Sequence, residues 1–289
     1  MSARANNRQT QPATSTFSYA PAPESRDIAR LKPSYQIFVD GGFRDGAGDA
    51  IKTINPADES PLAEVAEAGT SDVDDAVKAA RRASDTWAKL PGKERGKYLF
   101  RIARAIQERG RELSVLESLD NGKPIRESRD VDIPTAAAHF FYYAGWADKL
   151  GHAGFGPDPK PVGVAGQVIP WNFPLLMAAW KIAPALACGN TVVLKPAETT
   201  PLTALVLAEI IAEAGLPNGV VNVLAGGPSI GQAIVEHDGL DKIAFTGSTE
   251  VGKIIQRTLA GTGRRVSLEL GGKAANIVFD DAPIDQAVE

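Results

Sequence analysis

Residues 162–174 read VGVAGQVIPWNFP, an apolar run followed by a short loop between two prolines. The first part, 162–169, carries no charged residue and is typical of a strand buried on both faces of a sheet. Pro170 ends that strand, and Pro174 suits the first position of the helix that follows. We therefore expect an α/β unit to begin at this point of the chain.

The same alternation of short apolar runs and longer amphipathic or apolar segments continues to the C-terminal residue. TVVLKP (191–196) and KIAFTGS (242–248) are two of the strand-like runs, and glycines separate them from the helical segments. We predict an α/β fold over residues 162–289, with a doubly wound, mostly parallel, Rossmann-like sheet flanked by helices. A final strand is expected at AANIVFDD, residues 274–281.

The preceding region, 34–150, is expected to be a mainly helical part with a β-hairpin near its start. The stretch 51–68 predicts two short strands around an Asn-Pro turn, and amphipathic helices follow it. Residues 1–33 are rich in Ser, Thr, Ala and Pro and poor in large apolar side chains. Such a segment buries too little surface to offset its ordering entropy, so we predict a disordered N-terminal tail there.

Composition argues against several classes of protein. The net charge of −4 gives no reason to expect a nucleic-acid or membrane partner, and no apolar run reaches the ~18 residues of a membrane span. Cys188 is the single cysteine, and His139, His152 and His237 are far apart, so we expect no metal site. We expect a cytoplasmic location; the early arginines leave a transit peptide as the alternative.

Polar residues follow the first two predicted strands of the sheet. Asn172 is the one polar side chain between the two prolines, where its amide could donate a hydrogen bond to a developing oxyanion. The alternative is an asparagine that caps the next helix. Glu198, with Lys195, follows the second strand, where a carboxylate accepts hydrogen bonds from adenosine ribose hydroxyls and repels a 2′-phosphate. This favours NAD over NADP; the alternative is a solvated pair at a helix start.

Glycine turns and a second carboxylate follow the later strands. Gly247 allows close approach of a ligand, and Ser248 at a helix start suits a pyrophosphate; Gly227 lies in a second glycine turn. For both, a plain strand-to-helix turn is the alternative. Glu269 stands beside two glycines, which suits a general base that moves toward a water, or else a surface glutamate. Cys188 ends an apolar helix with no flanking histidine, and we interpret it as packing.

Five motifs occur in order and at compatible spacing, and together they resemble the aldehyde dehydrogenase superfamily, whose members use NAD(P). The similarity runs from about Phe38 to Glu289 and includes NPADESPLAEVAEA and LDNGKPIRES in the N-terminal region. The five motifs are VGVAGQVIPWNFP, GNTVVLKPAETTPLTA, GLPNGVVNVLAGG, KIAFTGSTEVGK and LELGGKAANIVFDDA.

The resemblance implies a role for each candidate residue. In that family a cysteine thiolate attacks an aldehyde, hydride passes to NAD, and the resulting thioester is hydrolysed to a carboxylic acid. Asn172 matches the oxyanion-stabilising amide, and Glu269 matches the base that activates water. The remaining matches concern the cofactor: Lys195 and Glu198 for the ribose, Ser248 with Gly247 for the pyrophosphate, and Ile169 and Trp171 for the adenosine side of the cleft.

The resemblance also implies what is missing. The family's nucleophilic cysteine lies further beyond the active-site glutamate than Glu289, and no cysteine follows Glu269. We therefore expect an incomplete coenzyme-binding domain over 34–289 without its catalytic domain, inactive alone. Its partners would be an aldehyde and either a second copy or a complementing C-terminal chain. The link 151–161 is shorter than in many members, where a β-hairpin there helps to form the oligomer.

Two other functions remain open on the sequence. One is a non-catalytic dinucleotide-binding or scaffold subunit of a split or degenerate aldehyde dehydrogenase. The other is a related acyl-phosphate or acyl-CoA reductase on the same scaffold. The presence of Glu269 argues against the reductase, because hydrolysis of an acyl-enzyme needs that base.

Overall fold

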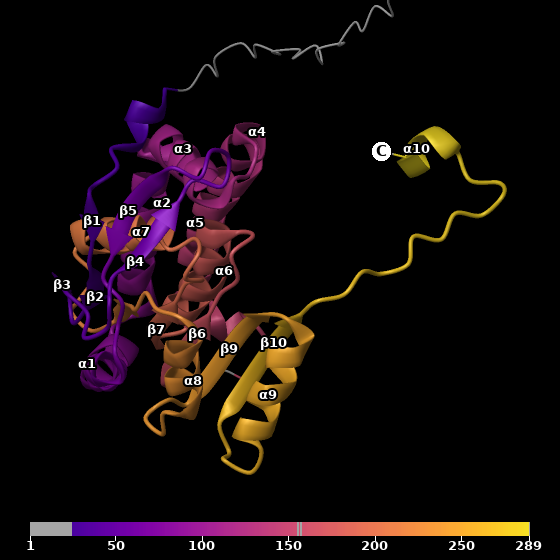
Figure 1. Cartoon of the computed structure of the whole chain (residues 1–289). Helices are drawn as coiled ribbons and strands as arrows, with labels where there is room; N and C mark the ends of the chain where they lie inside the picture. Colours follow the sequence, from indigo (N-terminus) through magenta and orange to yellow (C-terminus); the bar gives the residue numbers. More distant parts are fainter. Residues whose placement is uncertain (1–24, 155, 157, 289) are drawn as a thin grey trace, which may run out of the picture.

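The computed structural model describes residues 25–154, 156 and 158–288. In this part of the chain a seven-stranded sheet forms the centre, with the order β10-β9-β6-β7-β8-β2-β3 (Figure 1). The five strands of the first part of that order are parallel. They are β6 (Val164–Val168), β7 (Thr191–Lys195), β8 (Val221–Val223), β9 (Lys242–Gly247) and β10 (Arg265–Leu270).

The strand order reverses next to β6. From β6 the chain proceeds to β7 and β8 on one side, and then crosses over to β9 and β10 on the other. The loops that leave β6 and β9 therefore diverge at their carboxyl ends and leave a crevice between them. In doubly wound sheets this switch point is where ligands bind. The predicted doubly wound, mostly parallel sheet is confirmed.

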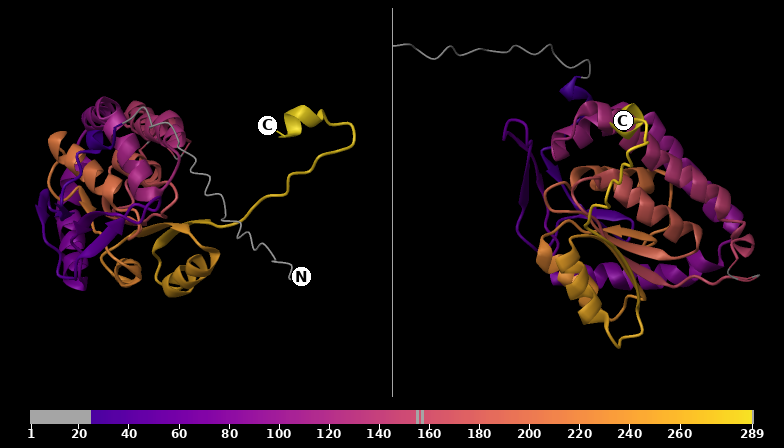
Figure 2. Two further views of the ribbon diagram at one scale, coloured as in Figure 1. Left: turned by 45° about the horizontal axis from the view of Figure 1, so that its top comes forward. Right: turned by 90° about the vertical axis from the view of Figure 1, so that its right-hand side faces the viewer.

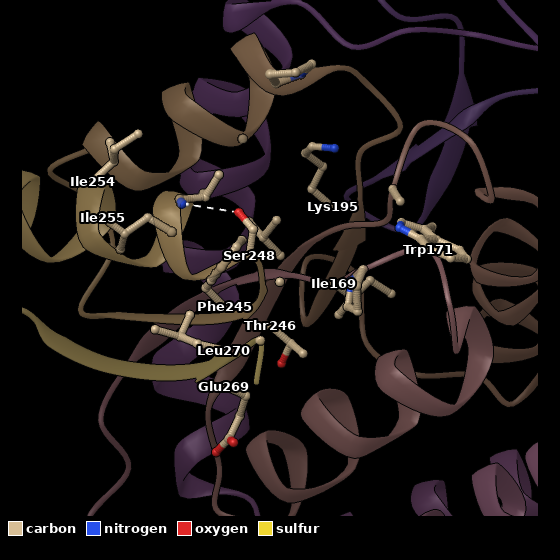
Figure 3. Close-up of a pocket in the computed structure, with 18 of the residues that line it drawn as sticks. Ile169, Trp171, Lys195, Phe245, Thr246, Ser248, Ile254, Ile255, Glu269 and Leu270 are labelled. Carbon is tan, nitrogen blue, oxygen red and sulfur yellow. Dashed lines mark hydrogen bonds between the residues drawn. The ribbon is translucent and has the colours of Figure 1, made fainter. Parts of the chain in front are cut away.

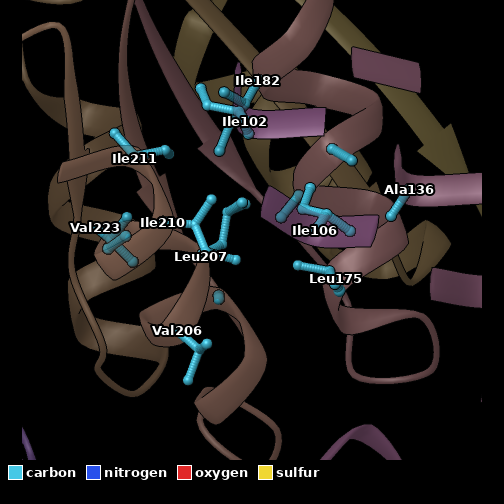
Figure 4. Packing of buried hydrophobic residues seen from close by; sticks show 14 of the residues in the cluster. Ile102, Ile106, Ala136, Leu175, Ile182, Val206, Leu207, Ile210, Ile211 and Val223 are labelled. Carbon is cyan, nitrogen blue, oxygen red and sulfur yellow. The ribbon is translucent and has the colours of Figure 1, made fainter. Parts of the chain in front are cut away.

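Helices cover both faces of the sheet because its central strands are apolar on both faces. Val192 and Leu194 of β7 belong to one buried cluster, and Val193 between them belongs to the other. The first cluster also holds residues of α6 and α7 and of an outer helical layer, and Figure 4 shows part of it. These helices are α6 (Pro174–Ala187), α7 (Leu202–Glu213), α2 (Gly92–Glu108), α3 (Gly110–Asn121) and α5 (Ile133–Trp146). The second cluster is covered by α1 (Thr70–Lys89), α8 (Pro228–Glu236) and α9 (Thr249–Leu259).

The N-terminal region contributes to two sheets. The predicted β-hairpin is present as β4 (Ile51–Ile54) and β5 (Pro61–Val65), with the short β1 (Ser34–Tyr35) beside β5. By contrast, β2 (Ile37–Val39) and β3 (Gly42–Arg44) join the large sheet, antiparallel to β8 and to each other. The large sheet therefore draws strands from both predicted parts, 34–150 and 162–289.

Two expectations are corrected by the structure. The prediction of a tail over 1–33 is wrong for residues 25–33, because a 3₁₀ helix at Arg26–Ala29 buries Ala29 against the helical layer; residues 1–24 lie outside the described residues. The strand predicted at 274–281 does not form. After β10 the chain leaves the body of the molecule (Figure 2), and no strand pairs with the outer edge of β10 in the described part. Ile277 and Phe279 are each 71% exposed.

No helix among the described residues combines the length and apolarity needed to cross a bilayer.

Two carboxyl groups of α3 are buried beneath the helices that follow β6 and β7. Asp120 accepts a hydrogen bond from the Leu202 amide at 2.9 Å and so caps α7. Glu117 is fully buried, and burial is the main cause that raises its pKa to about 7; the nearby Thr203 hydroxyl and Leu175 amide oppose this rise without forming hydrogen bonds of full geometry. The charged form of Glu117 is therefore disfavoured in the folded protein.

We predict that Glu117→Gln changes how stability depends on pH. Because the pKa of Glu117 is raised in the folded protein, its protonated carboxyl contributes fully to the free energy of unfolding below the ordinary pKa of 4.5. This contribution is lost as pH rises through about 7. The neutral amide has no such loss. As pH rises from about 5 to about 8, the free energy of unfolding of the variant should therefore increase relative to that of the wild type by on the order of 2–3 kcal/mol. Urea unfolding at each pH measures this difference.

The matched control is Glu108→Gln, whose side chain is 66% exposed at the end of α2. It should leave the pH dependence of unfolding unchanged. If Glu117→Gln and the wild type lose stability in parallel as pH rises, the raised pKa of Glu117 is wrong.

Candidate active site

A cleft of about 1080 Å³ opens at the carboxyl ends of β6, β7, β9 and β10. Its walls come from the loops after these strands and from α8 and α9 (Figure 3). It therefore occupies the switch point of the sheet, where the strand order reverses. Its volume is slightly above the range of about 300–1,000 Å³ that is usual for small-molecule and cofactor sites.

Most of the residues that the sequence singled out lie on the walls of this one cleft. They come from four strand ends that are up to about a hundred residues apart in sequence, and the parallel sheet brings them to one edge. The lining residues among them are Ile169, Trp171, Asn172, Lys195, Glu198, Gly247, Ser248 and Glu269.

Gly227 is the predicted site residue that does not line the cleft. Its amide donates a hydrogen bond to the Glu67 carboxylate at 2.8 Å, and the next residue, Pro228, forms part of the wall. An amide already bonded to a carboxylate is not free to bind a phosphate oxygen. A cofactor contact through the amide of Gly227 is therefore not supported by this geometry.

The amide of Asn172 is free to act on a ligand. Phe173, not Asn172, is the N-cap residue of α6, and no side chain caps that helix end. Asn172 is exposed and its side chain makes no hydrogen bond to any other residue that the structure describes. The alternative of a helix-capping asparagine is therefore wrong, and the donor remains available on the wall of the cleft.

Lys195 and Glu198 form a pair at the end of β7. The ammonium group of Lys195 donates to the Pro196 carbonyl at 2.9 Å and lies 3.4 Å from a carboxylate oxygen of Glu198. Burial lowers the pKa of Lys195, and the Glu198 carboxylate opposes that change. Because Lys195 is only 4% exposed, the alternative of a fully solvated pair does not describe it. The more exposed Glu198 presents acceptor oxygens to the cleft.

Ser248 is the N-cap of α9. Its hydroxyl oxygen accepts a hydrogen bond from the Val251 amide at 3.3 Å, drawn as a dashed line in Figure 3. A hydroxyl used in this way retains its proton, which can be donated to an anionic oxygen at the helix start. Gly247 lies against the ring of Phe245, and a Cβ there would come within 2.5 Å of it. A larger residue at this strand end would therefore require the Phe245 ring to move.

Glu269 stands at the end of β10, across the cleft from the β6 loop, and an amine on α6 lies within its electrostatic reach. Burial lowers the pKa of Lys181 to about 8, the Glu269 carboxylate opposes this change, and Lys242 adds to it. Sequence reasoning missed Lys181. The signal was present, because Lys181 is the one charged residue in the otherwise apolar α6, PLLMAAWKIAPALA.

Cys188 does not lie in the cleft. It is the C-cap residue of α6, whereas Asn172 precedes the start of that 14-residue helix, so the two are about 20 Å apart at 1.5 Å per residue. Burial also raises the pKa of its thiol. The partly buried thiol fits the predicted packing role. Among the described residues, no three His, Cys, Asp or Glu side chains gather as a metal site would require.

Comparison with known proteins agrees with this geometry. The aldehyde dehydrogenase family matches residues 43–289. Retinal dehydrogenase 2 of Homo sapiens is 48% identical over 268 residues, which are 88% of this chain and 52% of that protein.

Solved structures give the same result. The NAD⁺ complex of an aldehyde dehydrogenase from Bacillus cereus has a TM-score of 0.85 at 45% identity, covering 93% of this chain and 57% of that one. An NAD-dependent aldehyde dehydrogenase from Sinorhizobium meliloti has a TM-score of 0.83 at 42% identity, covering 90% and 54%. The chain thus spans about half the length of the relatives it matches, and it belongs to the aldehyde dehydrogenase family.

Proposed function

We propose that the protein to which this chain belongs is an NAD-dependent aldehyde dehydrogenase that oxidises an aldehyde to a carboxylic acid. One observation carries the proposal. In a chain of this family, an unbonded amide donor (Asn172) and a carboxylate (Glu269) line the same cleft as the pair Lys195 and Glu198. An oxyanion donor, a base and acceptors for ribose hydroxyls are the groups that this oxidation needs from the protein.

The cofactor half of the cleft fits NAD. The carboxylate of Glu198 and the ammonium of Lys195 would bind the adenosine ribose, and the Ser248 hydroxyl would donate to the pyrophosphate. When bound, NAD would supply the electron acceptor of the reaction. The negative charge of Glu198 disfavours a 2′-phosphate, so we propose NAD over NADP.

The chemical half would stabilise charge and activate water. Asn172 would donate to the carbonyl oxygen as it becomes negative, and Glu269 would take a proton from the water that hydrolyses an acyl-thioester. Cys188 lies at the wrong end of α6 to be the nucleophile. We therefore propose that the attacking thiolate comes from protein outside this sequence.

We also propose that the whole protein is a cytoplasmic homo-oligomer. Tyr142 on α5 and Trp180 on α6 are more than half exposed, and these two helices pack against each other. Exposed aromatic side chains on adjoining helices support a contact surface.

In the whole protein, Glu269→Gln should slow the steady state but not the first turnover. Removal of the base leaves attack and oxidation intact while hydrolysis of the acyl-enzyme slows by about 10²-fold or more. Stopped-flow absorbance of the reduced nicotinamide should then show one stoichiometric burst followed by slow turnover. Glu250→Gln, an exposed residue in the first turn of α9, is the control and should keep the wild-type rate. Wild-type steady-state turnover in Glu269→Gln would contradict the assigned role.

Glu198→Gln should relax the choice of cofactor. Removal of the carboxylate removes its repulsion of the 2′-phosphate, so the ratio of NADP to NAD affinity should rise about tenfold, or roughly 1.4 kcal/mol, in titration calorimetry. Glu213→Gln, an exposed position at the far end of α7, is the matched control. An unchanged affinity ratio would show that Glu198 does not select the cofactor.

A protein of residues 1–289 alone should not reduce NAD in the presence of an aldehyde. The only thiol of this sequence is about 20 Å from Asn172 along α6, so no nucleophile reaches the carbonyl. The measurement is nicotinamide absorbance with excess chain, and NAD binding followed in parallel shows that the cleft is formed. If the Cys188→Ala variant of this chain still reduced NAD in the presence of an aldehyde, the proposal that the thiolate comes from outside this sequence would be wrong.

A further inference from the structure

We propose that Asn121, at the end of α3, is a positioning residue that sets the direction of the Asn172 amide. The inference rests on the proposed role of Asn172 as the oxyanion donor. It concerns the loop 170–173 between β6 and α6 and the turn of residues 121–123, which lies against that loop.

The residue before Asn172 is held by a side chain from α3. The Nδ2 of Asn121 donates a hydrogen bond to the Trp171 carbonyl at 2.5 Å, although the two residues are 50 positions apart in sequence. The Thr200 hydroxyl donates to the same carbonyl at 3.3 Å, which is a weaker contact. One carbonyl oxygen therefore has two side-chain donors, and the Asn121 amide is the closer.

The residue after Asn172 is held by the same turn. The ammonium of Lys123 lies 3.6 Å from the centre of the Phe173 ring, which is a cation–π contact. The ammonium is itself fixed by the buried Asp132 carboxylate at 2.5 Å. The two neighbours of Asn172 are thus both held by side chains that are two residues apart in sequence.

The 121–123 turn is well placed to hold the loop because its own backbone is constrained. Gly122 has a φ of +80° and its amide bonds to the Ser118 carbonyl, so α3 ends in a left-handed turn that needs glycine. A Cβ at Gly122 would also come within 3.1 Å of Pro56. Two residues before Gly122, the Asp120 carboxylate caps α7. Movement of the turn would therefore disturb several contacts at once.

These contacts matter because Asn172 has no partner of its own in the described structure. An exposed amide with no internal hydrogen bond takes its direction from the backbone on either side. A misplacement of about 1 Å at a reacting centre can cost about 10²-fold in rate. We therefore infer that the donor is pre-organised from outside the cleft, through the Trp171 carbonyl.

The test is a set of variants of the whole protein, compared by kcat and by KM for NAD. Asn121→Ala should lower kcat about 10- to 100-fold and leave KM for NAD within about twofold, because Lys195 and Glu198 are not disturbed. Asn121→Asp keeps the size but replaces the donor with an oxygen that faces a carbonyl, so its loss should be at least as large. Asn218→Ala, an exposed asparagine in the loop before β8, is the matched control.

A double-mutant cycle separates positioning from a general structural role. Asn172→Ala should itself lower kcat, and Asn121→Ala added to it should cause no further loss, since Asn121 acts through Asn172. If Asn121→Ala does not fold, Thr200→Val replaces it in the test, because it removes the weaker donor to the same carbonyl. It should cause a smaller loss of kcat, and it should cause no further loss when combined with Asn172→Ala.

Each outcome has one meaning. If Asn172→Ala lowers kcat but Asn121→Ala and Thr200→Val do not, the proposed function stands and the positioning role is wrong. Losses that add fully in the double variants also overturn it, because Asn121 would then act independently. If the wild type oxidises no aldehyde, or Asn172→Ala keeps the wild-type kcat, the proposed function fails and the inference fails with it.

Discussion

The parallel pairing of β6 with β7 on one side and β9 on the other is the constraint on which the site depends. Residues 165–168 bond to both neighbours, so the carboxyl ends of the three strands are fixed at one edge. Because the helices after β6 and β9 cover opposite faces of the sheet, the loops that lead to these helices diverge at that edge. Asn172, after β6, and the glycine turn at Gly247, at the end of β9, line the same cleft because of this pairing. The relative position of the loops after β6 and β9 is therefore set by the sheet.

The sheet and most of the cleft could be predicted because their signals are local. An uncharged run that ends at a proline, as at Ile169-Pro170, indicates a buried strand and its end whatever lies around it. The two antiparallel strands at the other end of the sheet could not be predicted in the same way. The segments at Ile37–Val39 and Gly42–Arg44 read as an ordinary strand and turn, and only the contact with β8 shows which sheet they join. For residues 274–281 the pattern was that of a strand, but a strand needs a neighbour, and none pairs with β10 in the described residues.

Within the site, sequence reasoning interpreted least well the residues whose role depends on the path of a loop or on a partner far away in sequence. The choice between a capping and a free Asn172 is made by the loop, which places Phe173 at the helix start instead. The amide of Gly227 is bonded to Glu67, 160 residues earlier, and no local pattern predicts that contact. Lys181 is the exception, because a lone charge in an apolar helix can be seen in the sequence. Its significance still depends on Glu269, which lies on strand β10 and is 88 residues away in sequence.

Helix α3 connects the stability of the fold with the geometry of the site. Asp120 caps α7, which follows the Lys195–Glu198 loop, and Glu117 lies beneath the first turn of α6, which follows the Asn172 loop. The next residue along, Asn121, reaches the Asn172 loop itself. Burying two carboxyl groups one helical turn apart is unfavourable, and apolar residues of similar size would pack at lower cost. The two carboxyl groups nevertheless lie next to the first turns of α6 and α7. The backbone amides of a first helical turn have no partner within the helix. Helix α3 therefore lies against the starts of two of the helices that lead out of the cleft, bonded to α7 through Asp120 and close to α6 through Glu117.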